Sequence, residues 1–201
     1  MKYRLSIHHD DMAESPEYDT FEVISFNRYH GSFRDPNEVF DELEDEFDEG
    51  FAFFLSYFEH GLCRWSLKAD GVDPMLAGDW RWDGVNTAGI VRMSSADSGT
   101  IAWWQSLDMD ERRKVLRQFL ESYTDWANGN CWGFTWQRLE ECSHGDLHVV
   151  EDLDSIWGYV GSDILWGIRE YAPADATEDN TEVVDEYGAT AYADIWEKAS
   201  A

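Results

Sequence analysis

Residues 35–58 constrain the fold of this chain more than any other stretch, because they read as an acidic helix followed directly by a buried strand. Asp35 and Pro36 suit an N-cap and a first helical position, and Glu38 completes a capping box. Gly50 then ends the helix, and the mostly apolar run after it suits a buried strand and is too short to span a membrane. One helical stripe carries the apolar residues Val39, Phe40, Leu43 and Phe47.

The other faces of this predicted helix carry carboxylates, which makes it an unusual surface. Like charges four residues apart destabilise a helix by about 0.2–0.5 kcal/mol per pair, and acids in the last turn oppose the helix dipole. A helix that needs only solubility would gain from interspersed lysines. We therefore predict a surface for a basic partner, with a merely solvated face as the alternative. The predicted partner-binding residues are Asp41, Glu42, Asp45, Glu46, Asp48 and Glu49, and of these Glu42, Asp45, Glu46 and Glu49 are expected on the outer half of the helix.

The whole chain is strongly acidic, with a formal net charge of −27 over 201 residues. A small soluble domain typically carries a net charge of magnitude about 2–8. Direct binding to nucleic acid is disfavoured because phosphate contacts need Lys and Arg, and anionic membrane surfaces are disfavoured for the same reason. A basic partner protein, a cationic ligand and halophilic adaptation remain open.

The termini and cysteines point to a reducing compartment. The N-terminus has no apolar core of a signal peptide, and no stretch is apolar for long enough to cross a membrane. Three cysteines, Cys63, Cys131 and Cys142, make an odd and sparse set. We therefore expect a cytoplasmic protein without structural disulfides.

The order of elements predicts an α+β fold with a mostly antiparallel sheet and two main amphipathic helices. The second helix, at 109–127, begins at a capping box of Asp108 and Glu111 and ends at Asn128-Gly129. We expect residues 1–172 to form a single domain and residues 173–201 to form an acidic linker with a short terminal helix at 189–199. Strands are expected at 3–8, 21–26, 51–58, 62–69, 88–93, 131–139 and 147–153, and further helices at 36–48 and 163–171. The helices at 36–48 and 109–127 are expected to pack on one sheet face and to bury Phe40, Phe47, Phe54, Leu116 and Phe119.

Several short motifs, read together, resemble a family of uncharacterised phage-encoded proteins. They are Ala13-Glu14-Ser15-Pro16, Arg28-Tyr29, His60-Gly61, Trp82-Asp83-Gly84 with Gly89, the end of the second helix leading into Gly133, and Trp157-Gly158-Tyr159-Val160-Gly161. The resemblance covers about residues 3–171. Residues 82–89 are one residue longer than the family pattern, and residues 172–201 lie beyond it. The resemblance implies a phage origin and the cytoplasm of an infected bacterial host, and it implies no activity.

Three groups of residues have the chemistry of a catalytic or metal site. His60 with Asp83, beside Glu59, is the best catalytic candidate, because a carboxylate can orient a histidine as a general base. A histidine before a hairpin glycine is, alternatively, only a turn residue. Cys142, His144 and His148 have the residue types of a zinc site but fit no standard spacing. The third candidate set, His8-His9-Asp10-Asp11, is split between the two faces of a strand, so we expect no metal and no cofactor.

The leading hypothesis is a non-enzymatic, phage-encoded inhibitor that binds a basic host protein. Its acidic helix, with Glu59, Glu140, Glu141 and the acidic tail, would imitate a phosphate track and block a nucleic-acid-binding defence or replication protein. The first alternative is a small-molecule enzyme or ligand sequesterer with a pocket near His60 and Asp83. The second alternative is a structural protein whose acidity gives solubility. Trp103-Trp104 is either a partner hot spot or part of the core.

Overall fold

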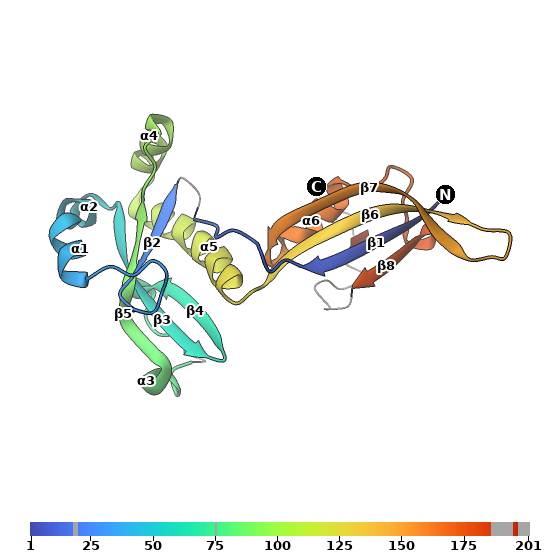
Figure 1. The fold of residues 1–201 in the computed structure, drawn as a ribbon. Coiled ribbons are helices and arrows are strands. Elements are labelled where there is room, and N and C mark those ends of the chain that lie inside the picture. Colours follow the sequence, from blue (N-terminus) through green and yellow to red (C-terminus); the bar gives the residue numbers. More distant parts are fainter. Residues whose placement is uncertain (18–19, 75, 186–194, 197–201) are drawn as a thin grey trace. The chain divides into compact units, whose positions relative to one another are not determined.

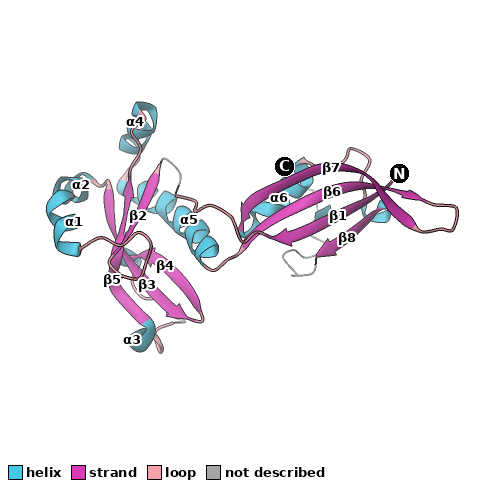
Figure 2. Ribbon diagram, in the orientation of Figure 1, coloured by secondary structure: helices cyan, strands magenta, loops and turns pink. Residues whose placement is uncertain are grey.

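The computed structural model describes residues 1–17, 20–74, 76–185 and 195–196. The chain is α+β, and its strands form two four-stranded sheets in which every pairing but one is antiparallel among the described residues (Figures 1 and 2). Packing contacts divide the chain into two compact units, which differs from the expectation of a single domain at residues 1–172. The terminal unit comprises residues 1–14 and 129–201, and the central unit comprises residues 15–128.

The terminal unit is a sheet with the strand order β7-β6-β1-β8 and a helix packed against it. The buried side chains of Leu5, Phe134 and Trp136 face Ile164 and Ile168 of that helix, because successive side chains of a strand alternate between its two faces. Its elements are β1 (Lys2–His9), β6 (Cys131–Glu141), β7 (Leu147–Val160), α6 (Ile164–Glu170), β8 (Thr181–Asp185) and the 3-10 turns η2 (Gly161–Asp163) and η3 (Glu178–Asn180).

The expected acidic linker is part of this sheet. Strand β8 lies in the region assigned to the linker and pairs in parallel with β1. The Tyr3 hydroxyl donates to Asp175, and Arg4 forms an ion pair with Glu182 at 3.0 Å. The expected terminal helix at 189–199 lies outside the described residues except for 195–196, which are helical, and Ile195 is buried in the core of this unit.

The central unit is a sheet with the strand order β2-β5-β3-β4 and helices on both faces (Figure 1). Strand β5 lies inside the sheet and pairs antiparallel with both β2 and β3. Its elements are β2 (Phe21–Ser25), α1 (Pro36–Glu42), α2 (Glu44–Glu49), β3 (Ala52–His60), β4 (Leu62–Leu67), η1 (Lys68–Asp70), α3 (Trp80–Asp83), β5 (Gly84–Met93), α4 (Ser98–Ser106) and α5 (Met109–Ala127).

The acidic helices and α5 cover opposite faces of this sheet, so the expectation that they share one face is wrong. Alternation along the strands separates the two cores: Val23 and Val91 pack with α5, whereas Ile24 and Ile90 pack with α1 and α2. Of the five residues expected in the core, Leu116 is fully buried, Phe47, Phe54 and Phe119 are half-buried, and Phe40 is 38% exposed.

The acidic segment is two short helices and not one. Asp35 caps α1 by accepting a hydrogen bond from the Asn37 backbone N–H at 2.9 Å, as expected of an N-cap. The helix breaks at Leu43, whose φ and ψ of −107° and 14° are not helical and whose side chain is buried. Gly50 ends α2 with a left-handed φ of 74°, as predicted. The predicted capping box of Asp108 and Glu111 is also confirmed.

Side chains close both edges of the central sheet. Asn128 and Thr124, at the end of α5, accept hydrogen bonds from the backbone N–H groups of Cys63 and Trp65 on the edge strand β4, at 2.7 and 3.1 Å. On the opposite edge, Glu17 accepts from the Val23 N–H of β2. Bonding of this kind removes the open donors that would otherwise invite another strand to pair.

Candidate functional site

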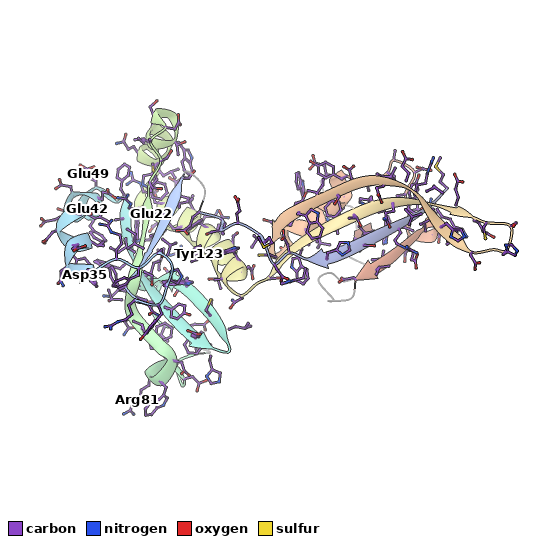
Figure 3. All side chains as sticks on the ribbon, in the orientation of Figure 1. Glu22, Asp35, Glu42, Glu49, Arg81 and Tyr123 are labelled. Atoms are coloured by element: carbon purple, nitrogen blue, oxygen red, sulfur yellow. The ribbon has the colours of Figure 1, made fainter. Side chains whose placement is uncertain are left out.

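The exposed face of α1 and α2 carries a dense set of carboxylates (Figure 3). A helix turns by about 100° per residue, so Asp41, Asp45 and Asp48 project opposite the buried Val39 and Leu43. We call the set of exposed carboxylates on α1 and α2 without an ion-pair partner among the described residues the acidic face. It consists of Glu38, Asp41, Glu44, Asp45, Asp48 and Glu49, which are all exposed and make no side-chain ion pair with the described part of the chain.

Glu42 and Glu46, two of the six predicted partner-binding residues, have partners inside the protein. Glu42 flanks the acidic face and forms an ion pair with Arg34, and this hydrogen bond lowers the pKa of the Glu42 carboxyl and raises that of the guanidinium. Glu46 points toward the sheet and pairs with Arg92 at 3.2 Å. The expectation that Glu46 lies on the outer half is therefore wrong, because its position on the helix is next to the buried stripe.

A buried arginine holds the end of α2 in place. Arg112 of α5 is 8% exposed and has no carboxylate partner within the described residues. Its guanidinium donates to the carbonyls of Glu49 and Gly50 at 2.9 and 3.2 Å, and to those of Trp104 and Leu107 at 3.0 and 3.1 Å. These carbonyls lie at the C-terminal ends of α2 and α4, where the helix dipole favours a cation. Sequence reasoning missed Arg112, which looks like one more polar residue of an amphipathic helix.

The catalytic candidates His60 and Asp83 are in contact with each other. The His60 Nδ1 lies 2.8 Å from an Asp83 carboxylate oxygen, although the two residues are 23 positions apart. This hydrogen bond raises the pKa of the imidazole. His60 is exposed at the β3–β4 turn, and Asp83 ends α3. The geometry thus provides a carboxylate-oriented histidine, without a serine, threonine or cysteine in hydrogen-bond contact with it in the described structure.

A cavity of about 530 Å³ opens beside this pair. It arises because the N-terminal half of β5 extends beyond the C-terminal end of its antiparallel partner β2. The Phe26 N–H still donates to the Ala88 carbonyl, and the chain then turns away from β5. The cavity is of ordinary size for a small-ligand site. We call it the β5 cavity, and it is lined by Ser25, Phe26, Asn27, His30, Tyr57, Glu59, Trp65, Trp82, Asp83, Gly84, Val85, Thr87 and Ala88.

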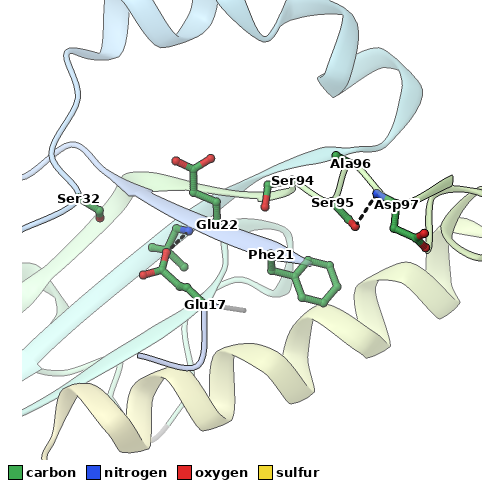
Figure 4. Close-up of a pocket in the computed structure, with 9 residues that line it drawn as sticks. Glu17, Phe21, Glu22, Ser32, Ser94, Ser95, Ala96 and Asp97 are labelled. Carbon is green, nitrogen blue, oxygen red and sulfur yellow. Dashed lines mark hydrogen bonds between the residues drawn. The ribbon is translucent and has the colours of Figure 1, made fainter. Parts of the chain in front are cut away.

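A second cavity, of about 650 Å³, lies along the outer edge of β2 and was not foreseen from the sequence (Figure 4). Its carboxylates are already engaged. Glu17 accepts from the Val23 N–H, Glu22 pairs with Arg92, and Asp97 caps α4 by accepting from the Thr100 N–H at 2.7 Å. These contacts give the acids of this cavity structural roles.

Several of the metal-site candidates make other contacts. His8 stacks on Trp157, and His9 lies within hydrogen-bond distance of Asp11 and of the Gly129 carbonyl. The Cys142 sulfur accepts from the His144 N–H in the hairpin turn. Within the described ranges, no three His, Cys, Asp or Glu side chains are grouped to hold a metal ion.

The paired tryptophans divide between core and surface. Trp104 is fully buried and donates its indole N–H to the Gly50 carbonyl at 3.0 Å, whereas Trp103 is 42% exposed. Trp104 is therefore a core residue.

Comparison with protein families, with characterised proteins and with solved structures gives no match. Among the described residues, no helix combines the length and apolar character needed to cross a membrane.

Proposed function

We propose that this protein is an acidic inhibitor that binds a basic, nucleic-acid-binding protein through the face formed by α1 and α2. The observation that carries the proposal is the set of exposed carboxylates on these helices that have no ion-pair partner inside the described chain. Unpaired like charges held on one surface repel one another, so the face costs folding free energy that a bound cationic partner would recover.

The spacing of the charges supports mimicry of a nucleic acid strand. Six unpaired carboxylates lie between Glu38 and Glu49. The two short helices are broken at Leu43, so at 1.5 Å rise per residue this segment spans at most about 17 Å, or at least about one charge per 3 Å. A single strand of duplex DNA carries one phosphate per about 3.4 Å. A groove built to bind DNA would therefore meet a similar density of negative charge.

The resemblance to phage proteins leads us to propose a partner in the infected bacterium, either a defence factor or a replication factor. Such proteins bind phosphate with clustered Lys and Arg, and a dense negative charge steers association with these clusters. In this proposal the protein acts in the bacterial cytoplasm and needs no cofactor.

The test compares two variants with the same change in charge. Asp41, Asp45 and Asp48 are replaced together by Lys on the acidic face, and Asp146, Asp154 and Glu170 are replaced together by Lys in the terminal unit as the control. Partners are captured from bacterial lysate at low and at high salt and then purified. A labelled DNA duplex bound to the purified partner serves as the reporter for competition.

The wild type and the control variant should displace the duplex equally. The Asp41, Asp45 and Asp48 variant should lose at least about tenfold in affinity, mainly through slower association, and the loss should be larger at low salt. Its folding stability should be unchanged or slightly higher, because like-charge repulsion is relieved. Equal losses in both variants would reduce the effect to net charge, and no loss in either would refute the proposal.

A second candidate function is a small-molecule enzyme or ligand sequesterer at the β5 cavity. The specific observation in its favour is the 2.8 Å contact between His60 and Asp83 beside a cavity of ligand size. Histidine oriented by a carboxylate is the arrangement of a general base.

A further inference from the structure

The inner wall of the β5 cavity is aromatic. The Tyr57 and Trp65 rings are 4.7 Å apart between centroids, and the His30 ring meets Trp65 edge-on at 5.5 Å. Trp65 is buried, and its packing against Tyr57 holds this wall in one arrangement. Aromatic faces carry partial negative charge and attract cations.

Two carboxylates face the same space. The Tyr57 hydroxyl donates to one Glu59 oxygen at 2.7 Å, and His60 contacts one Asp83 oxygen. The second oxygen of each carboxylate, Glu59 Oε1 and Asp83 Oδ1, has no hydrogen-bond partner within the described residues. The lining contains neither Lys nor Arg.

An exposed tryptophan completes the mouth of the cavity. Trp82 is 78% exposed, which is unusual for so large an apolar side chain. Arg81 lies outside the lining and places its guanidinium 5.2 Å from the Trp82 ring centroid (Arg81 is labelled in Figure 3). The indole at the mouth thus already stacks with a guanidinium group.

We infer that the β5 cavity binds an organic cation, and that a guanidinium group is its best match. A guanidinium is planar, so it stacks on indole and phenol rings, and its N–H groups suit the two free carboxylate oxygens. This inference rests on the second candidate function and is independent of the acidic face. The guanidinium group belongs either to a free small molecule or to an arginine side chain of a partner.

The test measures binding to the full-length protein by isothermal titration calorimetry, because 11 tryptophans make fluorescence hard to assign. The probe is N-acetylarginine amide, and its neutral isostere N-acetylcitrulline amide is the matched ligand control. The variants are Asp83→Asn and Trp82→Ala. Glu44→Gln, an exposed acid on α2 outside the cavity, controls for the general attraction of a cation to an acidic protein.

The arginine compound should bind at least about tenfold more tightly than the citrulline compound, and Asp83→Asn and Trp82→Ala should each weaken it by about tenfold. Glu44→Gln should leave the affinity within about twofold. Arg81→Gln should strengthen binding, because it removes a like charge and uncovers the indole face. This opposite sign cannot result from a damaged fold.

The outcomes separate this inference from the function on which it rests. Equal binding of both compounds would keep the cavity as a ligand site and overturn its selectivity for cations. No binding of either compound, or equal losses in Glu44→Gln and Asp83→Asn, would overturn the cation site. Titration with agmatine and with a Gly-Arg-Gly peptide then distinguishes a free small molecule from an arginine side chain as the source.

Discussion

Replacing Arg112 with Met tests how the sheet and the acidic helices are held together. Arg112 is a buried cation whose guanidinium is satisfied by backbone carbonyls and by the rings of Phe51 and Trp104, at 5.9 and 5.5 Å. Methionine keeps most of the apolar stem and loses all the N–H donors. The substitution therefore isolates the hydrogen bonds from the packing.

The expected cost follows from the carbonyls that lose their donor. The Gly50 carbonyl keeps the Trp104 indole N–H, and the Trp104 carbonyl keeps the Leu107 N–H. The Glu49 and Leu107 carbonyls lose bonds of 2.9 and 3.1 Å, and the Gln105 carbonyl loses a longer one of 3.4 Å. An unsatisfied buried carbonyl costs about 1–3 kcal/mol, and the removal of a buried charge offsets part of the total. We expect Arg112→Met to lower the free energy of unfolding by about 3 kcal/mol.

Urea unfolding gives the change in stability, and hydrogen exchange with mass spectrometry locates it. Protection should fall at the C-terminal ends of α2 and α4. Lys114→Met is the control, because Lys114 is an exposed cation on the same helix, and its effect should stay within about 0.5 kcal/mol. If Arg112→Met lowers the free energy of unfolding no more than Lys114→Met does, water molecules hydrogen-bond to the carbonyls in place of Arg112 and the reasoning is refuted.

Three further measurements test other parts of the structure. Nuclear magnetic resonance should find the pKa of His60 above the usual 6.5, because of its hydrogen bond to Asp83, and Asp83→Asn should return it toward that value. The stabilisation of the fold by this pair is full below pH 6.5 and is lost as the pH rises through the raised pKa of His60. A decrease in this stabilisation as the pH falls toward 6.5 would contradict the assignment. Asn128→Ala removes two hydrogen bonds to the Cys63 backbone, at 2.7 and 2.9 Å. It should lower the free energy of unfolding in urea by about 1–2 kcal/mol. It should also promote self-association through β4, which size-exclusion chromatography would detect. Phe119→Ala should lower the free energy of unfolding by about 2–3 kcal/mol, because Phe119 is half-buried and a fully buried phenylalanine costs about 3–5 kcal/mol. A larger loss would mean that Phe119 is packed more tightly than the structure indicates.

Local signals in the sequence located the ends of the main helices. Asp35 and Asp108 act as N-caps, and Gly50 ends α2, because these roles depend on neighbours within about four residues. The alternating and helical patterns likewise predicted most strands and α5. The excess of acidic residues is also a property of the sequence alone.

The tertiary structure decided which of those acids are free. Glu46 was expected on the outside, but Arg92, from a strand distant in sequence, takes one of its oxygens. The helix breaks at Leu43, whose side chain is buried, and local helix propensity does not predict this break. The acidic face that remains unpaired is therefore a result of packing.

Long-range pairing also decided the division of the chain. Strand β8 lies in a stretch that reads as an acidic linker, yet it pairs with β1 at the other end of the sequence. The β5 cavity exists because β5 extends beyond the end of β2, a difference in strand length that hydrophobic patterning does not encode. The sequence determined which elements form and how they are charged. Contacts between residues far apart determined which side chains remain available for a partner, because burial and ion pairing depend on the neighbours that folding brings together.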